Sequence, residues 1–181
     1  MLTVTHVGGQ TIKISGGGLS ALFFPKDGKL GPSTKDTLTF LSVPEETPTP
    51  GVISWPGEYH EKDVAIRGIG HLEGQQVSYV LEWDGVRVAV LSSPLQDFTD
   101  FQLEQIGDAD AMIFPAEDAK LLQKLFDEID PQTLIVLPGK DSKAREEVLK
   151  LCGAVNKEVV SEHKIKAGPT ADAREVVLMG K

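Results

Sequence analysis

The chain has 181 residues, of which 40% are hydrophobic and 25% are charged, as in a soluble globular protein of one domain. The formal net charge of −9 at pH 7 argues against a nucleic-acid-binding surface, which needs clustered Lys and Arg. The sequence shows no basic start followed by an apolar run, as in a secretory signal, and no apolar stretch of the roughly 20 residues that cross a bilayer. We therefore expect a single domain over residues 1–181 that binds neither nucleic acid nor membrane.

Cysteine usage bears on the compartment. The single cysteine, Cys152, cannot form a disulfide within the chain, and it falls where a helix face would bury it. A reducing environment suits such a chain, so we expect a cytoplasmic protein.

The first 51 residues are typical of short strands separated by turns. Glycine-rich turns separate three predicted strands, over Leu2–Val7, Gln10–Ser15 and Leu19–Phe24. The glycine spacing does not match a phosphate-binding loop. A polar loop is expected over Pro25–Lys35, and Thr37–Val43 alternates as a further strand. The prolines within Pro44–Gly51 exclude a helix there.

The central stretch, Val52–Ser93, is the most β-rich part of the chain and contains both Trp residues. Val77–Glu82 and Val86–Leu91 are apolar and β-branched, and Asp84-Gly85 lies between them. This pattern predicts a β-hairpin. Another strand, around Ile66, precedes the hairpin.

After the hairpin, the chain alternates between helix and strand patterns. Thr99 and Gln102 have the spacing of a capping box, which predicts a short helix ending at Gly107. Ala109–Phe114 and Thr133–Leu137 are rich in apolar residues and are predicted to be buried strands.

Two amphipathic helices complete the pattern. One is predicted by apolar residues on a single face between Leu121 and Ile129, and Asp130-Pro131 ends it. The other begins near Asp141-Ser142 and ends at Gly153. A strand–helix–strand–helix order predicts parallel strands joined by right-handed crossovers. The tail contains further short strand patterns, near Glu158–Val160 and Glu175–Met179.

These features together resemble the metallo-β-lactamase superfamily, in particular its compact hydrolase-like branch related to the ascorbate-phosphate lactonases. The resemblance covers about residues 52–140 and rests on four segments: Ser54-Trp55-Pro56-Gly57-Glu58-Tyr59, the Val64–Ile69 strand, the hairpin Tyr79–Val88, and Ile106-Gly107-Asp108-Ala109-Asp110. It implies an α/β fold, namely a four-layer αββα sandwich in which two mixed β-sheets lie face to face and are flanked by helices.

The resemblance also implies a metal site at one edge of the sandwich, where the family's His-x-His-x-Asp-His loop holds two divalent ions. On this sequence the loop motif falls on four residues, none of them histidine: Ser42, Pro44, Glu46 and Thr47. The position of the bridging Asp corresponds to Ser93. The position of the last His corresponds to Lys140, whose ammonium repels a cation. Of the family's histidine positions only His71 keeps its residue type, so we expect neither zinc nor another cofactor.

Three functions remain open. The first is a catalytically degenerate domain that binds an unidentified protein or small molecule, or assembles with itself. The second is a hydrolase of phosphate esters or lactones with a remodelled pocket of His71, Ser93 and Lys140, where Lys140 stabilises an oxyanion. The third is a subunit of a homo-oligomer whose partner chain supplies the missing groups. The lost ligand positions favour the first, a non-enzymatic role, and zinc is expected only under the second or third.

Other residue groups are weaker candidates for a site. The acidic cluster of Glu58, His60, Glu61 and Asp63 lacks a third fixed donor for a metal, and a solvated turn explains it better. Ser92 and Ser93 lie outside any nucleophile-elbow pattern, so hydroxyls that cap backbone groups are expected. An anion site at a helix start is a further candidate, formed by Lys140, Lys143 and Arg145.

Overall fold

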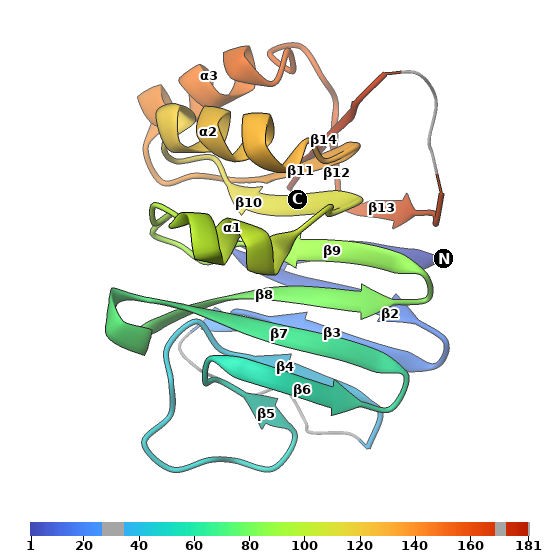
Figure 1. The fold of residues 1–181 in the computed structure, drawn as a ribbon. Helices are drawn as coiled ribbons and strands as arrows, with labels where there is room; N and C mark the ends of the chain where they lie inside the picture. The colour runs from blue at the N-terminus through green and yellow to red at the C-terminus, as the bar shows by residue number, and fades with distance from the viewer. Residues whose placement is uncertain (27–34, 169–172, 181) are drawn as a thin grey trace.

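The computed structural model describes residues 1–26, 35–168 and 173–180, and their strands form two facing β-sheets (Figure 1). The first sheet contains six strands: β1 (Leu2–Gly8), β2 (Thr11–Gly16), β3 (Leu19–Phe23), β4 (Thr37–Phe40), β5 (Val52–Ile53) and β13 (Glu162–Ile165). Their order is β13-β1-β2-β3-β4-β5, and the sheet is mixed because β3, β4 and β5 run parallel. The loop expected over Pro25–Lys35 lies largely outside the described residues.

The second sheet contains eight strands: β6 (Gly57–Glu61), β7 (Val64–His71), β8 (Gln76–Trp83), β9 (Val86–Val90), β10 (Ala111–Pro115), β11 (Thr133–Leu137), β12 (Val159–Val160) and β14 (Glu175–Met179). Their order is β12-β14-β11-β10-β9-β8-β7-β6. Strands β6 to β9 pair antiparallel, and β9, β10, β11, β14 and β12 pair parallel. The predicted hairpin and the parallel crossovers are both confirmed.

The three α-helices begin and end close to the residues that the sequence predicted. They are α1 (Asp100–Ile106), α2 (Ala119–Ile129) and α3 (Ser142–Leu151). The capping box of α1 is formed, because Thr99 accepts from the backbone of Gln102 and the Gln102 side chain accepts from the Thr99 N–H at 2.8 Å. None of the helices in these residues is both long and apolar enough to span a bilayer.

All three helices lie on the outer face of the eight-stranded sheet (Figure 1). Buried residues of α1 and α2, such as Ile106, Leu122 and Phe126, form one apolar cluster with Met112 and Leu134 of the sheet. Burial of this second apolar face explains why β10 and β11 are continuous apolar runs.

The two mixed sheets of the expected sandwich are confirmed, but its outermost helical layer on the six-stranded side is not found in the part of the chain that the structure describes. The outward-facing residues of that sheet include Thr5, Lys13 and Ser20, and they are half-buried or exposed. A polar face of this kind does not require a cover, because an antiparallel sheet can leave one face in water.

Strand β13 was missing from the sequence-based prediction. It pairs antiparallel with β1 in the six-stranded sheet, whereas β12 and β14 on either side of it in sequence join the eight-stranded sheet. The tail therefore crosses between the sheets. Its sequence, Glu-His-Lys-Ile, buries only Ile165, so the hydrophobic pattern was too weak to reveal it.

The core between the sheets depends on a group of aromatic rings. Phe23 and Phe40 of the six-stranded sheet stack with their centroids 4.4 Å apart, and Tyr79 of β8 packs edge-on against Phe40 at 5.0 Å. The Tyr79 hydroxyl donates to the carbonyl oxygens of Leu41 at 2.6 Å and Ile53 at 3.0 Å. One side chain thus links both sheets by packing and by hydrogen bonding.

We predict that Tyr79→Phe lowers the free energy of unfolding by about 1–3 kcal/mol, because two carbonyl oxygens lose a buried donor. Urea unfolding at pH 7 measures this change. Tyr59→Phe is the matched control, since its hydroxyl donates to the Trp55 carbonyl at an exposed position. Equal effects of the two substitutions would show that Tyr79 does not tie the sheets together.

Candidate functional site

The candidate site lies at the sandwich edge where the parallel strands end, on the left in Figure 1. His71 ends β7, and Ser92 and Ser93 follow β9. Loops after β10 and β11 reach the same edge, because those strands pair in parallel register. The loop after β4 is attached there too, since the Ser42 carbonyl accepts from the Val77 N–H at 2.9 Å. Carboxyl ends of parallel strands are the usual place for ligands in α/β folds.

His71 is buried in this edge and its imidazole contacts other side chains. Only 4% of the residue is exposed, and the ring packs edge to face on Phe98 with the centroids 4.6 Å apart. Nε2 lies 3.2 Å from the Ser78 hydroxyl, and Nδ1 is buried with no partner in the described residues. Burial lowers the pKa of His71 below its ordinary value, because it disfavours the charged imidazolium. His71 is thus a strand residue whose ring contacts side chains.

A closed network of hydroxyl and amide groups continues from His71. The Ser78 hydroxyl lies 3.1 Å from that of Ser92 and accepts from the Ser92 N–H at 3.1 Å. The Gln76 amide donates to the Ser92 hydroxyl and to the Pro94 carbonyl, both at 2.8 Å. Ser78 and Ser92 are each no more than 2% exposed. These groups satisfy one another, so neither hydroxyl is presented to a substrate.

Ser93 is bonded to a carboxylate that sequence analysis did not single out. Its hydroxyl donates to Glu117 Oε1, and the Leu95 N–H donates to Glu117 Oε2 at 2.6 Å. Glu117 follows β10 and thereby holds the loop that follows β9. The signal that could have found it is its position directly after a buried strand, where side chains reach the same edge as Ser93.

Lys140 lies in the loop after β11, exposed to solvent. The backbone before it approaches the end of β10 closely, because a β-carbon at Gly139 would lie 2.1 Å from the Ala116 carbonyl oxygen. Gln10 also reaches this loop and donates to the Pro138 carbonyl at 2.5 Å. The structure therefore brings His71, Ser93 and Lys140 to one edge, where His71 contacts Ser78 and Ser93 donates to Glu117, but no hydrogen bond found in the described residues joins any two of the three.

The loop that corresponds to the family's histidine motif is held by other residues. The backbone of Glu45 accepts from the Trp55 indole at 3.0 Å and donates to the Ser54 hydroxyl at 3.1 Å. Glu46 has a carboxylate where the motif has Asp, but it is exposed, as is Thr47. Pro44 has no side-chain donor atom for a metal.

The residues present do not fit a metal centre. Within residues 1–26, 35–168 and 173–180, no group of three or more His, Cys, Asp or Glu side chains is arranged to hold a metal ion. A catalytic zinc takes three protein ligands, whereas this edge offers one buried imidazole whose Nε2 already contacts Ser78. No reaction step through a metal follows from these residues.

The other candidate groups have structural partners. Glu58 of β6 forms an ion pair with Arg67 of β7. Asp110, which precedes β10, accepts from the Arg87 N–H at 2.7 Å. Burial raises the pKa of the Cys152 thiol to about 11, which makes it a poor nucleophile.

Comparison with known proteins identifies the fold. No protein-family model and no curated protein matches the sequence. A structure from Thermotoga maritima, named as a Zn-dependent hydrolase of the metallo-β-lactamase superfamily, matches with a TM-score of 0.73 and 20% identity. The match covers 99% of this chain and 98% of that one.

Two further structures agree. The metallo-β-lactamase fold protein YhfI from Bacillus subtilis matches with a TM-score of 0.65 and 10% identity, over 99% of this chain and 96% of that one. A structure from Parabacteroides distasonis, named as a metal-dependent hydrolase, matches with a TM-score of 0.62 and 13% identity, over 98% and 92%. The chain therefore has the metallo-β-lactamase fold, and the resemblance predicted from the sequence is confirmed at that level.

The burial of His71 leads to a prediction about how the stability of the fold depends on pH. Its pKa is lowered in the folded state, so the unfolded chain binds the proton first as the pH falls below the ordinary value of 6.5. The stability that the neutral imidazole contributes to the folded state is fully present above pH 6.5. It should therefore be lost progressively as the pH falls towards 5. We predict that His71→Gln, measured by urea unfolding at pH 7.5, 6.5 and 5.5, loses less stability over this range than the original chain.

His60→Gln is the control, because His60 is exposed on β6. It should keep the pH dependence of the original chain. An unchanged slope in His71→Gln would contradict the buried, neutral imidazole.

Proposed function

We propose that this protein is a catalytically silent member of the metallo-β-lactamase fold that acts by binding a ligand or partner or by assembling with itself. The observation that carries the proposal is the set of residues at the sandwich edge. Where the family's motif requires histidines and carboxylates, the chain has Ser42, Pro44, Glu46, Thr47, Ser93 and Lys140, of which only Glu46 is a carboxylate, and it is exposed.

The contacts at this edge support the proposal. His71 and the serines near it are buried among themselves, and Phe98 covers the imidazole. Glu117 is occupied by Ser93 and Leu95. These bonds stabilise the strand ends, whereas a hydrolase needs its nucleophile and its base directed at a substrate.

One observation favours the alternative of a metal-independent hydrolase. The Ser93 hydroxyl donates to the Glu117 carboxylate, and a hydroxyl bonded to a base is the arrangement that activates a nucleophile. Lys140 would then stabilise an oxyanion from the neighbouring loop. Against this reading, Glu117 also accepts from the Leu95 N–H, so its carboxylate already holds the loop that follows β9.

Self-assembly is part of the proposal and has its own test. Light scattering coupled to gel filtration gives the mass of the purified chain, of which one copy is 19.6 kDa. A dimer or larger species would support assembly. A strict monomer would leave binding of another molecule as the function.

We predict that the protein, expressed with zinc, iron and manganese in the medium and purified without chelator, contains less than about 0.1 metal ion per chain by mass spectrometry, because three protein ligands are not available. His71→Ala is the matched control, since any trace bound at this edge should disappear with the imidazole. One or two ions per chain that are lost in His71→Ala would refute a silent site.

Activity gives a separate prediction. A panel of phosphate monoesters, phosphodiesters and lactones should show no turnover above buffer with the original chain or with Ser93→Ala. Turnover that Ser93→Ala and Lys140→Ala each reduce at least tenfold would establish the hydrolase instead.

A further inference from the structure

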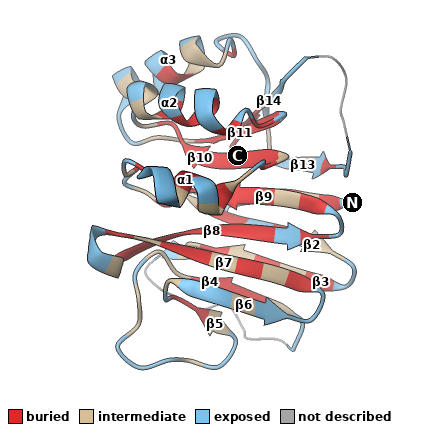
Figure 2. Cartoon of the chain, viewed as in Figure 1, coloured by how far each residue is buried: buried red, intermediate tan, exposed pale blue. Residues whose placement is uncertain are grey.

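Strand β6 forms one edge of the eight-stranded sheet. It is the last strand in the sheet order and pairs with β7, and no other strand of the described residues pairs with its opposite side. It lies at the lower end of the sheet in Figure 1, and four of its five residues are exposed (Figure 2). An edge of this kind presents backbone N–H and C=O groups that another strand can bind.

The other sheet edges of the described residues suit pairing less well. Strands β5 and β12 have only two residues each. Strand β13 has four and contains Lys164, a residue type that discourages pairing at edges. Strand β6, Gly-Glu-Tyr-His-Glu, contains neither Pro nor Lys and pairs with β7 without a bulge. It is therefore the edge best able to accept a further strand.

The register of β6 on β7 determines which backbone groups face this open side. A two-residue turn joins the strands, so Glu61 and Val64 form a hydrogen-bonded pair. Such pairs alternate along an antiparallel ladder, and Tyr59 is next to form one. The backbone N–H and C=O groups of Glu58 and His60 therefore point away from β7.

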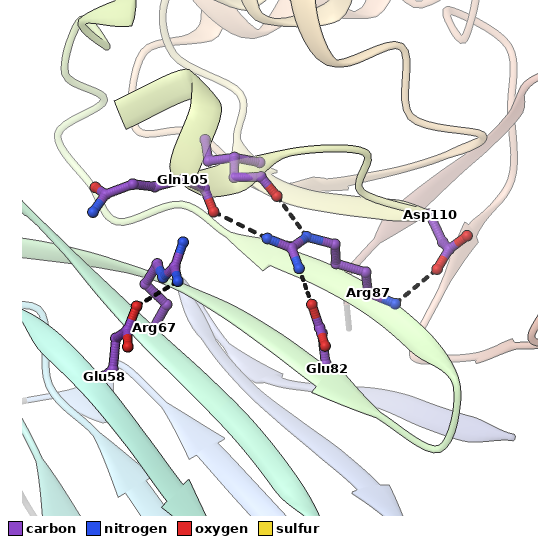
Figure 3. A network of polar contacts seen from close by, with 7 residues as sticks. Glu58, Arg67, Glu82, Arg87, Gln105 and Asp110 are labelled. Atoms are coloured by element: carbon purple, nitrogen blue, oxygen red, sulfur yellow. Dashed lines mark hydrogen bonds and ion pairs between the residues drawn. The ribbon is translucent and has the colours of Figure 1, made fainter. Parts of the chain in front are cut away.

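The side chains at this edge have unlike chemistry. Tyr59 packs against the core between the sheets, so Glu58 and His60 face the opposite side of the strand. The Glu58 carboxylate forms an ion pair with Arg67, its neighbour on β7 (Figure 3). The neighbour of His60 on β7 is Ala65, which has no charge. The edge thus presents an anionic and a basic side chain two residues apart.

This arrangement is complementary to itself. A twofold axis makes the pairing of a strand with its own copy antiparallel. If the axis passes at Tyr59, Glu58 of each copy lies directly opposite His60 of the partner subunit. All outward backbone groups of both residues then form hydrogen bonds, and each carboxylate faces an imidazole. Opposite charges in directly opposed positions stabilise a pair of strands.

Two other antiparallel registers bring outward-facing residues together, and both are poorer. Centred on Glu58, the pairing opposes two carboxylates and places Pro56, which has no N–H, at a hydrogen-bonded position. Centred on His60, it opposes two imidazoles and extends to Lys62, whose φ of 56° belongs to the turn. The register centred on Tyr59 is thus the one that uses every outward group and opposes unlike side chains.

We infer that β6 joins two copies of this chain into a twofold-symmetric dimer in which their eight-stranded sheets become continuous. The inference rests on the self-assembly in the proposed function and names its surface and its symmetry. The contact is small, so the dimer belongs to the weak, transient class. The net charge of −9 on each copy opposes association at low ionic strength, and about 150 mM salt reduces this repulsion.

The first test is sedimentation velocity at pH 7 in about 150 mM salt, from about 5 to 500 µM chain. The mass should rise from 19.6 kDa towards twice that value. Glu58→Lys and His60→Glu each oppose like charges across the axis and should each weaken the dimer at least tenfold. Both positions are exposed, so the fold should tolerate the changes. Glu128→Lys is the matched control, because it makes the same charge change at an exposed position on α2 and should dimerise at least as well as the original chain.

A mixture of the two variants tests the register. In a heterodimer of Glu58→Lys with His60→Glu, the introduced lysine faces the introduced glutamate, and the remaining Glu58 faces the remaining His60. The mixture should therefore dimerise within about threefold of the original affinity, although each variant alone does not.

The backbone bonds have a separate readout. Hydrogen exchange followed by NMR should slow at the amides of Glu58 and His60 as the concentration rises, while the amides of Tyr59 and Glu61, which face β7, should not change. His60→Pro removes one outward donor without removing a bond to β7, so it should abolish the dimer and leave the melting temperature of the monomer within a few degrees.

Four outcomes would overturn the inference: a monomer at every concentration, a dimer that His60→Pro leaves intact, a variant mixture no tighter than its components, or protection at amides of another edge. A dimer that persists in His60→Pro would keep self-assembly and refute only this surface. None of these outcomes concerns the metal content of the chain, which tests the silent edge separately.

Discussion

The structure depends on the packing of two mixed sheets across one aromatic core. Phe23 and Phe40 stack within the six-stranded sheet, and Tyr79 of the other sheet packs against Phe40 and donates to the carbonyl oxygens of Leu41 and Ile53. Aromatic pairs of this geometry stabilise a core by about 0.5–1.5 kcal/mol each beyond the area they bury. Since Leu41 begins the loop that corresponds to the family's metal motif, the same contact fixes where that loop starts.

This framework brings together strand ends whose side chains, among the residues that the structure describes, do not form a group that could hold a metal. In the fold's usual use, convergent loops present ligands to ions. Here the convergent groups bind one another: His71 contacts Ser78, Gln76 donates to Ser92, and Ser93 donates to Glu117. The architecture and the chemistry of its edge are thus separable, because the sheets require only apolar inner faces and closed strand ends.

Much of the fold could be predicted from the sequence because local signals were strong. Asp84-Gly85 specified the hairpin, and Thr99 with Gln102 specified the start of α1. Strand β13 could not be predicted, since its one buried residue gives no periodic pattern and its partner β1 is distant in sequence.

The candidate site was less predictable than the fold. The resemblance located the positions of His71, Ser93 and Lys140 at a common edge, but hydrogen bonds between segments far apart in sequence decide what those side chains do. Glu117 and Phe98 are examples, because each contacts a site residue more than 20 positions away.

The most direct test of the central claim is a crystal structure of the chain soaked in zinc, with anomalous scattering recorded at the zinc edge. The account predicts ordered His71 beside Ser78 and Phe98 and no anomalous peak near His71, Ser93 or Lys140. A pair of well-occupied peaks at this edge, with His71 turned towards them, would contradict it.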